Sequence, residues 1–123
     1  MTNSSKTIAV VEDDAGVRTA LEQLLRSAGF QALTFESAEA FLARSGKEQV
    51  HCLIADINLP GMSGVELVKG LGGNGHRLPA VLITGRRDAA TTELAREAGD
   101  VPRLYKPFSD SALFEVLGRI MHR

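Results

Sequence analysis

The stretch His51-Cys52-Leu53-Ile54-Ala55-Asp56 is followed by Ile57-Asn58-Leu59-Pro60-Gly61, so an apolar run ends in an acid and then in turn residues. This pattern predicts a buried strand that places the carboxylate of Asp56 at its C-terminal end. Three other strand-like runs also end in polar residues, namely in Glu12-Asp13-Asp14, Thr84-Gly85 and Lys106-Pro107. Because the acids, the hydroxyl and the lysine all follow strands, we expect one polar site at one edge of a sheet.

Length and composition are those of one soluble globular domain over residues 1–123. The formal net charge of −1 gives no bulk attraction to nucleic acid or to an anionic membrane, so neither is expected as a direct partner. No apolar run approaches the roughly 20 residues that span a bilayer, and the single Cys52 has no partner for an internal disulfide. Together these features favour the cytoplasm.

Strand and helix patterns alternate five times along the chain. The expected strands cover residues 7–11, 31–35, 51–56, 80–83 and 104–105. The expected helices run over 15–28, 38 to about 45, a segment containing Val65 to Leu71, 89–98 and a segment from Ser109 to Ile120. Short connections between such units imply right-handed crossovers and a parallel sheet. We predict an α/β protein, a flavodoxin-like (βα)5 three-layer sandwich whose five-stranded parallel sheet has the order 2-1-3-4-5.

In such a sheet the ligand crevice lies beyond the carboxyl ends of the first and third strands, which end here in Glu12, Asp13 and Asp56. Two carboxylates about 4 Å apart repel by roughly 4 kcal/mol at an effective dielectric near 20. Without a cation, one of them is therefore expected to have a raised pKa. A hard divalent ion such as Mg²⁺ relieves this repulsion, and the backbone carbonyl of Asn58 is a further candidate ligand.

Thr84 and Lys106 remain to be explained. A hydroxyl and an ammonium that face the same crevice are suited to the oxygens of a phosphoryl group. Asp56 is then placed to act as a nucleophile that attacks phosphorus and forms an acyl phosphate.

With these motifs the chain resembles the response-regulator receiver domains of two-component signalling, over essentially its full length. The motifs are Val10-Val11-Glu12-Asp13-Asp14, Asp56 with Asn58, Leu59 to Gly64, Thr84, and Lys106-Pro107-Phe108. The resemblance implies that Asp56 is the phosphoacceptor, with Thr84 as the switch hydroxyl and Lys106 as the phosphoryl-binding lysine. It also implies a site for Mg²⁺ or Mn²⁺ held by Asp13, Asp56, the Asn58 carbonyl and, through water, Glu12.

The resemblance further implies the partners. A sensor histidine kinase or a histidine phosphotransfer protein would supply the phosphoryl group. A homodimer or an output domain would use the surface of the fourth helix, fifth strand and fifth helix. Such a domain assists its own phosphorylation and dephosphorylation but is not a turnover enzyme. The chain is expected to be a single-domain regulator or the receiver part of a longer protein.

One position departs from the family pattern. Three residues before the lysine, where the family usually has an aromatic residue or histidine that moves with the switch threonine, stands Arg103. Tyr105 lies on the same strand face by period-two alternation. We expect the phosphorylation chemistry to be unaffected and the readout to differ.

Other interpretations fit less well. A phosphatase of the haloacid-dehalogenase type needs an acid two residues after its nucleophile, where Asn58 cannot transfer a proton. A phosphorylation-independent module commonly loses part of the acid, acceptor and lysine set, all of which is present. A flavodoxin needs a first loop that accepts phosphate, and the acids at 12–14 would repel it. Asp14 is expected to be a helix cap, and His51, His76 and His122 lack metal-binding spacing.

Overall fold

The computed structural model describes residues 6–44, 49–72 and 78–121, and within them strands and helices alternate. The strands are β1 (Thr7–Val11), β2 (Gln31–Phe35), β3 (Cys52–Asp56), β4 (Ala80–Thr84) and β5 (Arg103–Tyr105). The helices are α1 (Ala15–Ser27), α2 (Ala38–Leu42), α3 (Gly64–Gly72), α4 (Ala89–Arg96) and α5 (Asp110–Met121).

The five strands form one parallel sheet of order β2-β1-β3-β4-β5, which confirms the predicted flavodoxin-like architecture. Its register aligns the carboxyl ends of the central strands, because Val11 pairs with Ala55, and Asp56 with Ile83. Thr84 pairs with Tyr105 on the neighbouring strand. The residues that end β1, β3, β4 and β5 therefore meet at one edge of the sheet.

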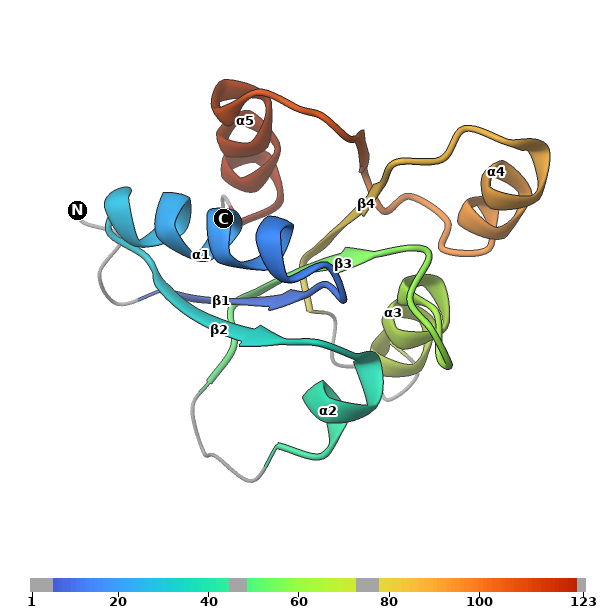
Figure 1. Cartoon of the computed structure of the whole chain (residues 1–123), viewed down its shortest axis with the longest axis horizontal. Coiled ribbons are helices and arrows are strands. Elements are labelled where there is room, and N and C mark those ends of the chain that lie inside the picture. Colours follow the sequence, from blue (N-terminus) through green and yellow to red (C-terminus); the bar gives the residue numbers. More distant parts are fainter. Residues whose placement is uncertain (1–5, 45–48, 73–77, 122–123) are drawn as a thin grey trace.

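Helices cover both faces of this sheet, with α1 and α5 on one side and α2, α3 and α4 on the other (Figure 1). Alternate strand residues face opposite sides, so Ile8 and Val10 pack under α1 and α5, whereas Ala9 and Val11 pack under the other helices. The three strands β1, β3 and β4 are buried along their whole length. Their uninterrupted apolar sequence is thus explained by burial on two faces.

Side-chain caps set the start of several helices. Asp14 accepts the N–H of Val17 at 3.0 Å and caps α1, as the sequence predicted. Ser37 and Ser109 cap α2 and α5 through the N–H groups of Ala40 and Ala112, each at 3.0 Å. At α4, Asp88 occupies the capping position, but its side chain makes no capping hydrogen bond.

Three helices end before their predicted limits, and α1 does so by one residue, at Ser27 with Ala28 as its cap. Helix α2 ends at Leu42, with Ala43 as its cap, and the predicted end near Ser45 lies outside the described residues. Helix α4 ends at Arg96 instead of Ala98, because the N–H groups of Glu97, Ala98 and Gly99 bond three residues back and tighten the last turn. Gly99 then adopts a φ of 73°, which reverses the chain. In the described part of the chain no helix is long and apolar enough to cross a bilayer.

Candidate functional site

Three carboxylates meet at the carboxyl edge of the sheet. Glu12 and Asp13 directly follow β1, Asp56 is the last residue of β3, and ligand oxygens of the three lie within 4.8 Å of one another. Glu12 is fully buried and Asp56 is buried, whereas Asp13 is exposed. The structure thus brings together the acids that the sequence placed at the first and third strand ends.

Lys106 lies between the two buried acids. Its Nζ is 2.7 Å from Asp56 Oδ2 and 2.9 Å from Glu12 Oε1. Burial opposes the charge of Lys106, but the hydrogen bonds and charges of Asp56 and Glu12 outweigh it and raise the lysine pKa. The lysine is followed by Pro107 through a cis peptide bond.

The pKa of Glu12 is raised chiefly by its burial. Contacts with Lys106 and the Asp14 N–H oppose this rise, and the nearby charge of Asp56 adds to it. The sequence predicted one raised carboxylate pKa from repulsion, and the structure shows that removal from water is the larger cause. Lys106 is the sole partner of Glu12 Oε1 among the described residues, whereas Oε2 accepts the Asp14 N–H at 3.0 Å.

Among the described residues, no hydrogen bond joins the Thr84 hydroxyl to Asp56. Its hydroxyl donates to the side-chain Oδ1 of Asn58 at 2.6 Å and accepts the N–H of Arg86 at 3.0 Å. Asn58 in turn donates its backbone N–H to Asp56 Oδ1 at 2.8 Å. The Asp56 carboxylate and the Thr84 hydroxyl are therefore connected through Asn58.

The loop after β3 approaches the site closely. A Cβ at Gly64 would collide with the backbone carbonyl of Asp56, so only glycine fits at the start of α3. This close approach explains why a glycine follows the turn residues after Asp56.

Several residues of the site were not found from the sequence. The side chain of Asn58 was not assigned a role, and Arg18 was not considered, although its guanidinium donates to the Glu12 carbonyl at 2.8 Å. No spacing rule links these residues to their partners, so only the folded chain identifies them. His51 accepts the Thr7 N–H at 3.0 Å, which is a structural role, and His76 and His122 lie outside the described residues.

The donor atoms fit a hard divalent cation. Three carboxylates supply oxygen ligands, and the buried Glu12 oxygen is held by a single ammonium group. An ion at this position would offset the cost of holding Glu12 ionised in a buried place. The cluster of Glu12, Asp13 and Asp56 is thus compatible with a bound divalent cation.

The fold and this acidic site define a flavodoxin-like α/β domain with a cluster of carboxylates at its topological switch point. The family model of the response regulator receiver domain matches residues 8–118, and the chain belongs to this family.

Known proteins agree with this membership. The chain is 37% identical over 113 residues to the transcriptional regulatory protein FixJ of Rhizobium meliloti, covering 92% of this chain and 55% of FixJ. Among solved structures, FixJ-N is 36% identical with a TM-score of 0.83, over 96% of this chain and 94% of FixJ-N. The response regulator StyR is 41% identical with a TM-score of 0.82, over 94% of this chain and 59% of StyR. The chain spans about half the length of the curated relatives it matches.

Proposed function

We propose that this domain is a phosphorylation-activated switch whose Asp56 accepts a phosphoryl group from a histidine kinase or a histidine phosphotransfer protein. The observation that carries the proposal is the contact of Lys106 with both Asp56 and Glu12, beside the exposed acid Asp13. This arrangement holds one carboxylate next to a fixed positive charge and a cluster of metal-binding oxygens. Membership of the receiver family supports the same function.

In the proposed reaction a carboxylate oxygen of Asp56 forms the new O–P bond while the P–N bond to the donor's imidazole breaks. The ammonium of Lys106, now shared between Asp56 and Glu12, would turn to the phosphoryl oxygens and offset their charge. The Asn58 N–H holds the other side of the carboxylate and fixes its orientation. A bound Mg²⁺ or Mn²⁺ would supply further charge neutralisation for the phosphoryl oxygens.

The readout is proposed to reach an output domain, a partner or a second copy through the surface of α4, β5 and α5. Each domain takes up one phosphoryl group and assists its own phosphorylation and dephosphorylation, so it acts as a switch and not as a turnover enzyme. The relative FixJ is named as a transcriptional regulatory protein, and we propose an output of that regulatory kind here.

The test is phosphorylation by a small donor such as acetyl phosphate with Mg²⁺, followed by intact-mass spectrometry. We expect one added phosphoryl group, no addition in EDTA, and no addition in Asp56→Asn. The matched control is Asp14→Asn, which changes a helix-capping acid next to the site and should still be labelled. A label that persists in Asp56→Asn would contradict the assignment of the acceptor.

A further inference from the structure

The side chain of Asn58 joins the site to helix α4. While its Oδ1 accepts the Thr84 hydroxyl at 2.6 Å, its Nδ2 lies 3.4 Å from the hydroxyl of Thr91, in the first turns of α4. Because the Thr84 oxygen already accepts the Arg86 N–H, its own proton is free to point to Asn58. This fixes the amide with its oxygen toward Thr84 and its nitrogen toward Thr91.

The far end of this bridge is also held. The nearby Thr91 hydroxyl is the chief cause of the lowered pKa of the Asp88 carboxyl. Thr84 is fully buried and Thr91 is only 5% exposed, so both hydroxyls depend on protein partners. A chain of hydrogen bonds therefore runs from Thr84 through Asn58 to Thr91 of α4, and Thr91 lies close to the carboxylate of Asp88, which precedes the helix.

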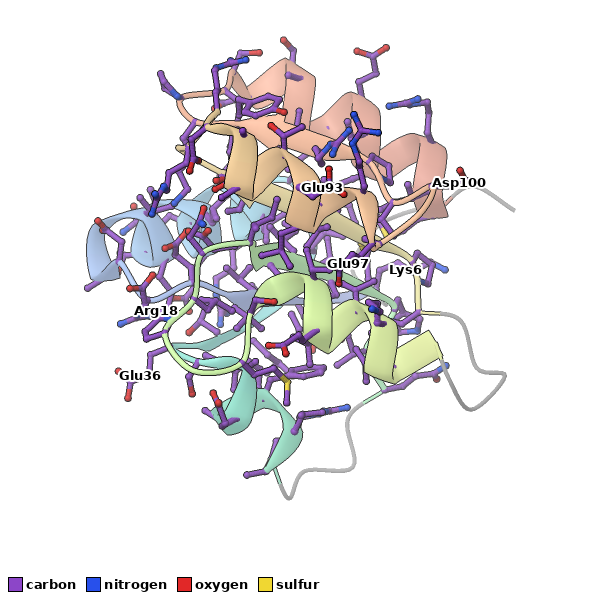
Figure 2. The ribbon with its side chains drawn as sticks, turned by 90° about the vertical axis from the view of Figure 1, so that its right-hand side faces the viewer. Lys6, Arg18, Glu36, Glu93, Glu97 and Asp100 are labelled. Carbon is purple, nitrogen blue, oxygen red and sulfur yellow. The ribbon has the colours of Figure 1, made fainter. Side chains whose placement is uncertain are left out.

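Few other contacts fix the start of helix α4: Asp88 pairs with Arg86 at 3.4 Å, and both side chains are exposed. The buried residues of α4 are Thr91 and Ala95, its one large apolar residue Leu94 is half-buried, and Asp88 gives no cap to the backbone. At its other end, Glu97 pairs with Lys69 of α3 at 3.3 Å, and both side chains are about half exposed. Figure 2 shows Glu97 at the end of α4, near α3. Such a surface ion pair contributes little, so the Asn58–Thr91 contact matters for how firmly α4 is held.

We propose that the side-chain amide of Asn58 is a positioning group that couples the Thr84 hydroxyl to the first turns of α4. This inference rests on the proposed function, because the Thr84 hydroxyl has one proton and cannot donate to Asn58 and to a phosphoryl oxygen at once. A hydrogen bond to an anionic oxygen is the stronger of the two. When Thr84 turns to the phosphoryl group, Asn58 Oδ1 loses its donor, the amide is free to turn, and its long contact with Thr91 is released.

The experiment measures amide hydrogen exchange along α4, with and without the phosphoryl mimic beryllofluoride and Mg²⁺, in three variants. Thr91→Val removes the hydroxyl on α4 and keeps the shape of the side chain. Asn58→Ala removes the whole bridge. Thr92→Val is the matched control, because it makes the same chemical change at the next residue of α4, which has no contact with Asn58 among those described.

In the wild type we expect beryllofluoride to speed exchange of the α4 amides by about fivefold, the factor that corresponds to one typical net hydrogen bond. Thr91→Val and Asn58→Ala should show this faster exchange already without beryllofluoride. In these two variants, beryllofluoride should then increase the exchange rate by much less than fivefold. Thr92→Val should keep the wild-type response. A purely structural role of Thr91 would instead raise the baseline and leave the response to the mimic unchanged, and that result would overturn the proposal.

The two proposals fail in different ways. Fluorine NMR of bound beryllofluoride reports the adduct at Asp56 independently of α4. If the wild type forms no adduct, the proposed function is overturned and the coupling with it. If the adduct forms and α4 responds equally in the wild type, Thr91→Val and Asn58→Ala, the coupling through Asn58 is overturned while the switch function stands.

Discussion

Glu12 and Asp13 are neighbours in sequence, but the fold gives their carboxylates different surroundings. Glu12 is fully buried and is paired with Lys106 at 2.9 Å, whereas Asp13 is exposed. Water therefore screens the repulsion between Asp13 and the other acids, whereas Glu12 bears the cost of burial. A bound cation would therefore stabilise the two acids in different ways. It would offset charge repulsion at Asp13 and the cost of desolvation at Glu12.

This difference predicts the effect of Asp13→Asn. Without metal, the variant should have a higher free energy of unfolding, because one of three close negative charges is removed. The gain should be at most about 1 kcal/mol, since Asp13 is solvent-screened. Mg²⁺ binding should become weaker. Denaturant unfolding in EDTA and a Mg²⁺ titration measure the two effects.

Substitutions of the neighbouring acid Asp14 provide a control, because they should not raise the free energy of unfolding. Asp14→Asn should not raise stability, because Asp14 caps α1 and Asn is an equally good cap, and Asp14→Ala should lower it by about 1 kcal/mol. A clearly less stable Asp13→Asn in EDTA would show that Asp13 is a structural hydrogen-bonding residue.

At the level of elements, α2 is tied to the loop between β3 and α3. Glu39 on α2 accepts the N–H of Met62 at 2.9 Å, and a Cβ on Gly61 would lie only 2.6 Å from the same Glu39 oxygen. Gly61 also has a φ of 73°, a conformation that side chains other than hydrogen rarely adopt. The sequence Pro60-Gly61 predicted a turn here, but it did not predict the contact of this turn with Glu39.

This contact predicts a pH dependence of the loop. The hydrogen bond from the Met62 N–H is the chief cause that lowers the pKa of Glu39 below the ordinary value of a glutamate. Between the folded and unfolded pKa values the unfolded chain binds more protons, so the stabilisation from Glu39 is present above about 4.5 and is lost as pH falls through the lowered pKa. The Met62 amide resonance should follow this titration. Glu39→Gln should abolish it, while Glu36→Gln, an exposed acid nearby, should leave it; a titration that persists in Glu39→Gln would refute the contact.

The elements differ in how well the sequence predicted them. Residues 7–11 and 31–35 were predicted with the observed bounds, because an apolar run between turn signals leaves little choice of limits. The ends of α2 and α4 were predicted too late in the sequence. At α4, the hydrogen bonds change from the i→i−4 to the i→i−3 pattern after Arg96, and this change follows from local packing and not from hydrophobic periodicity. The bridge from Asn58 to Thr91 spans 33 residues and has no local signal.

For the molecule as a whole, the position of the site follows from topology. Parallel strands in the order 2-1-3-4-5 bring their carboxyl ends to one edge, so strand-end residues such as Asp56, Thr84 and Lys106 could be placed together from the sequence. Which side chain contacts which partner within that edge depends on rotamers and on helix positions, and these follow only from the packed structure. The same division applies to the readout, because Arg103 could be recognised as unusual but its surroundings could not be derived.

The two faces of the sheet predict where the phosphorylation response appears. Leu104 packs on the side of α1 and α5, so Arg103 and Tyr105 face the side of α4 (Figure 1). Tyr105 is the cross-strand neighbour of Thr84, and the guanidinium of Arg87 lies 4.0 Å from the centre of its ring. Stacking of a cation on an aromatic face is favourable, so Arg87 stabilises the position of the Tyr105 ring next to Thr84. Arg103 is exposed at the start of β5.

When Thr84 turns to a phosphoryl group, the space that it vacates lies next to Tyr105 and not at Arg103. A guanidinium resists entering such a space because burial of an unpaired charge is costly. We therefore expect changes in the Thr84–Gly85 loop and α4, little change in α1 and in residues 113–117 of α5, and no inward movement of Arg103. Structures of the free protein and of its beryllofluoride complex test this, and Arg103→Ala should give the same pair of structures. An Arg103 side chain that turns inward in the complex would show that the readout runs through that position after all.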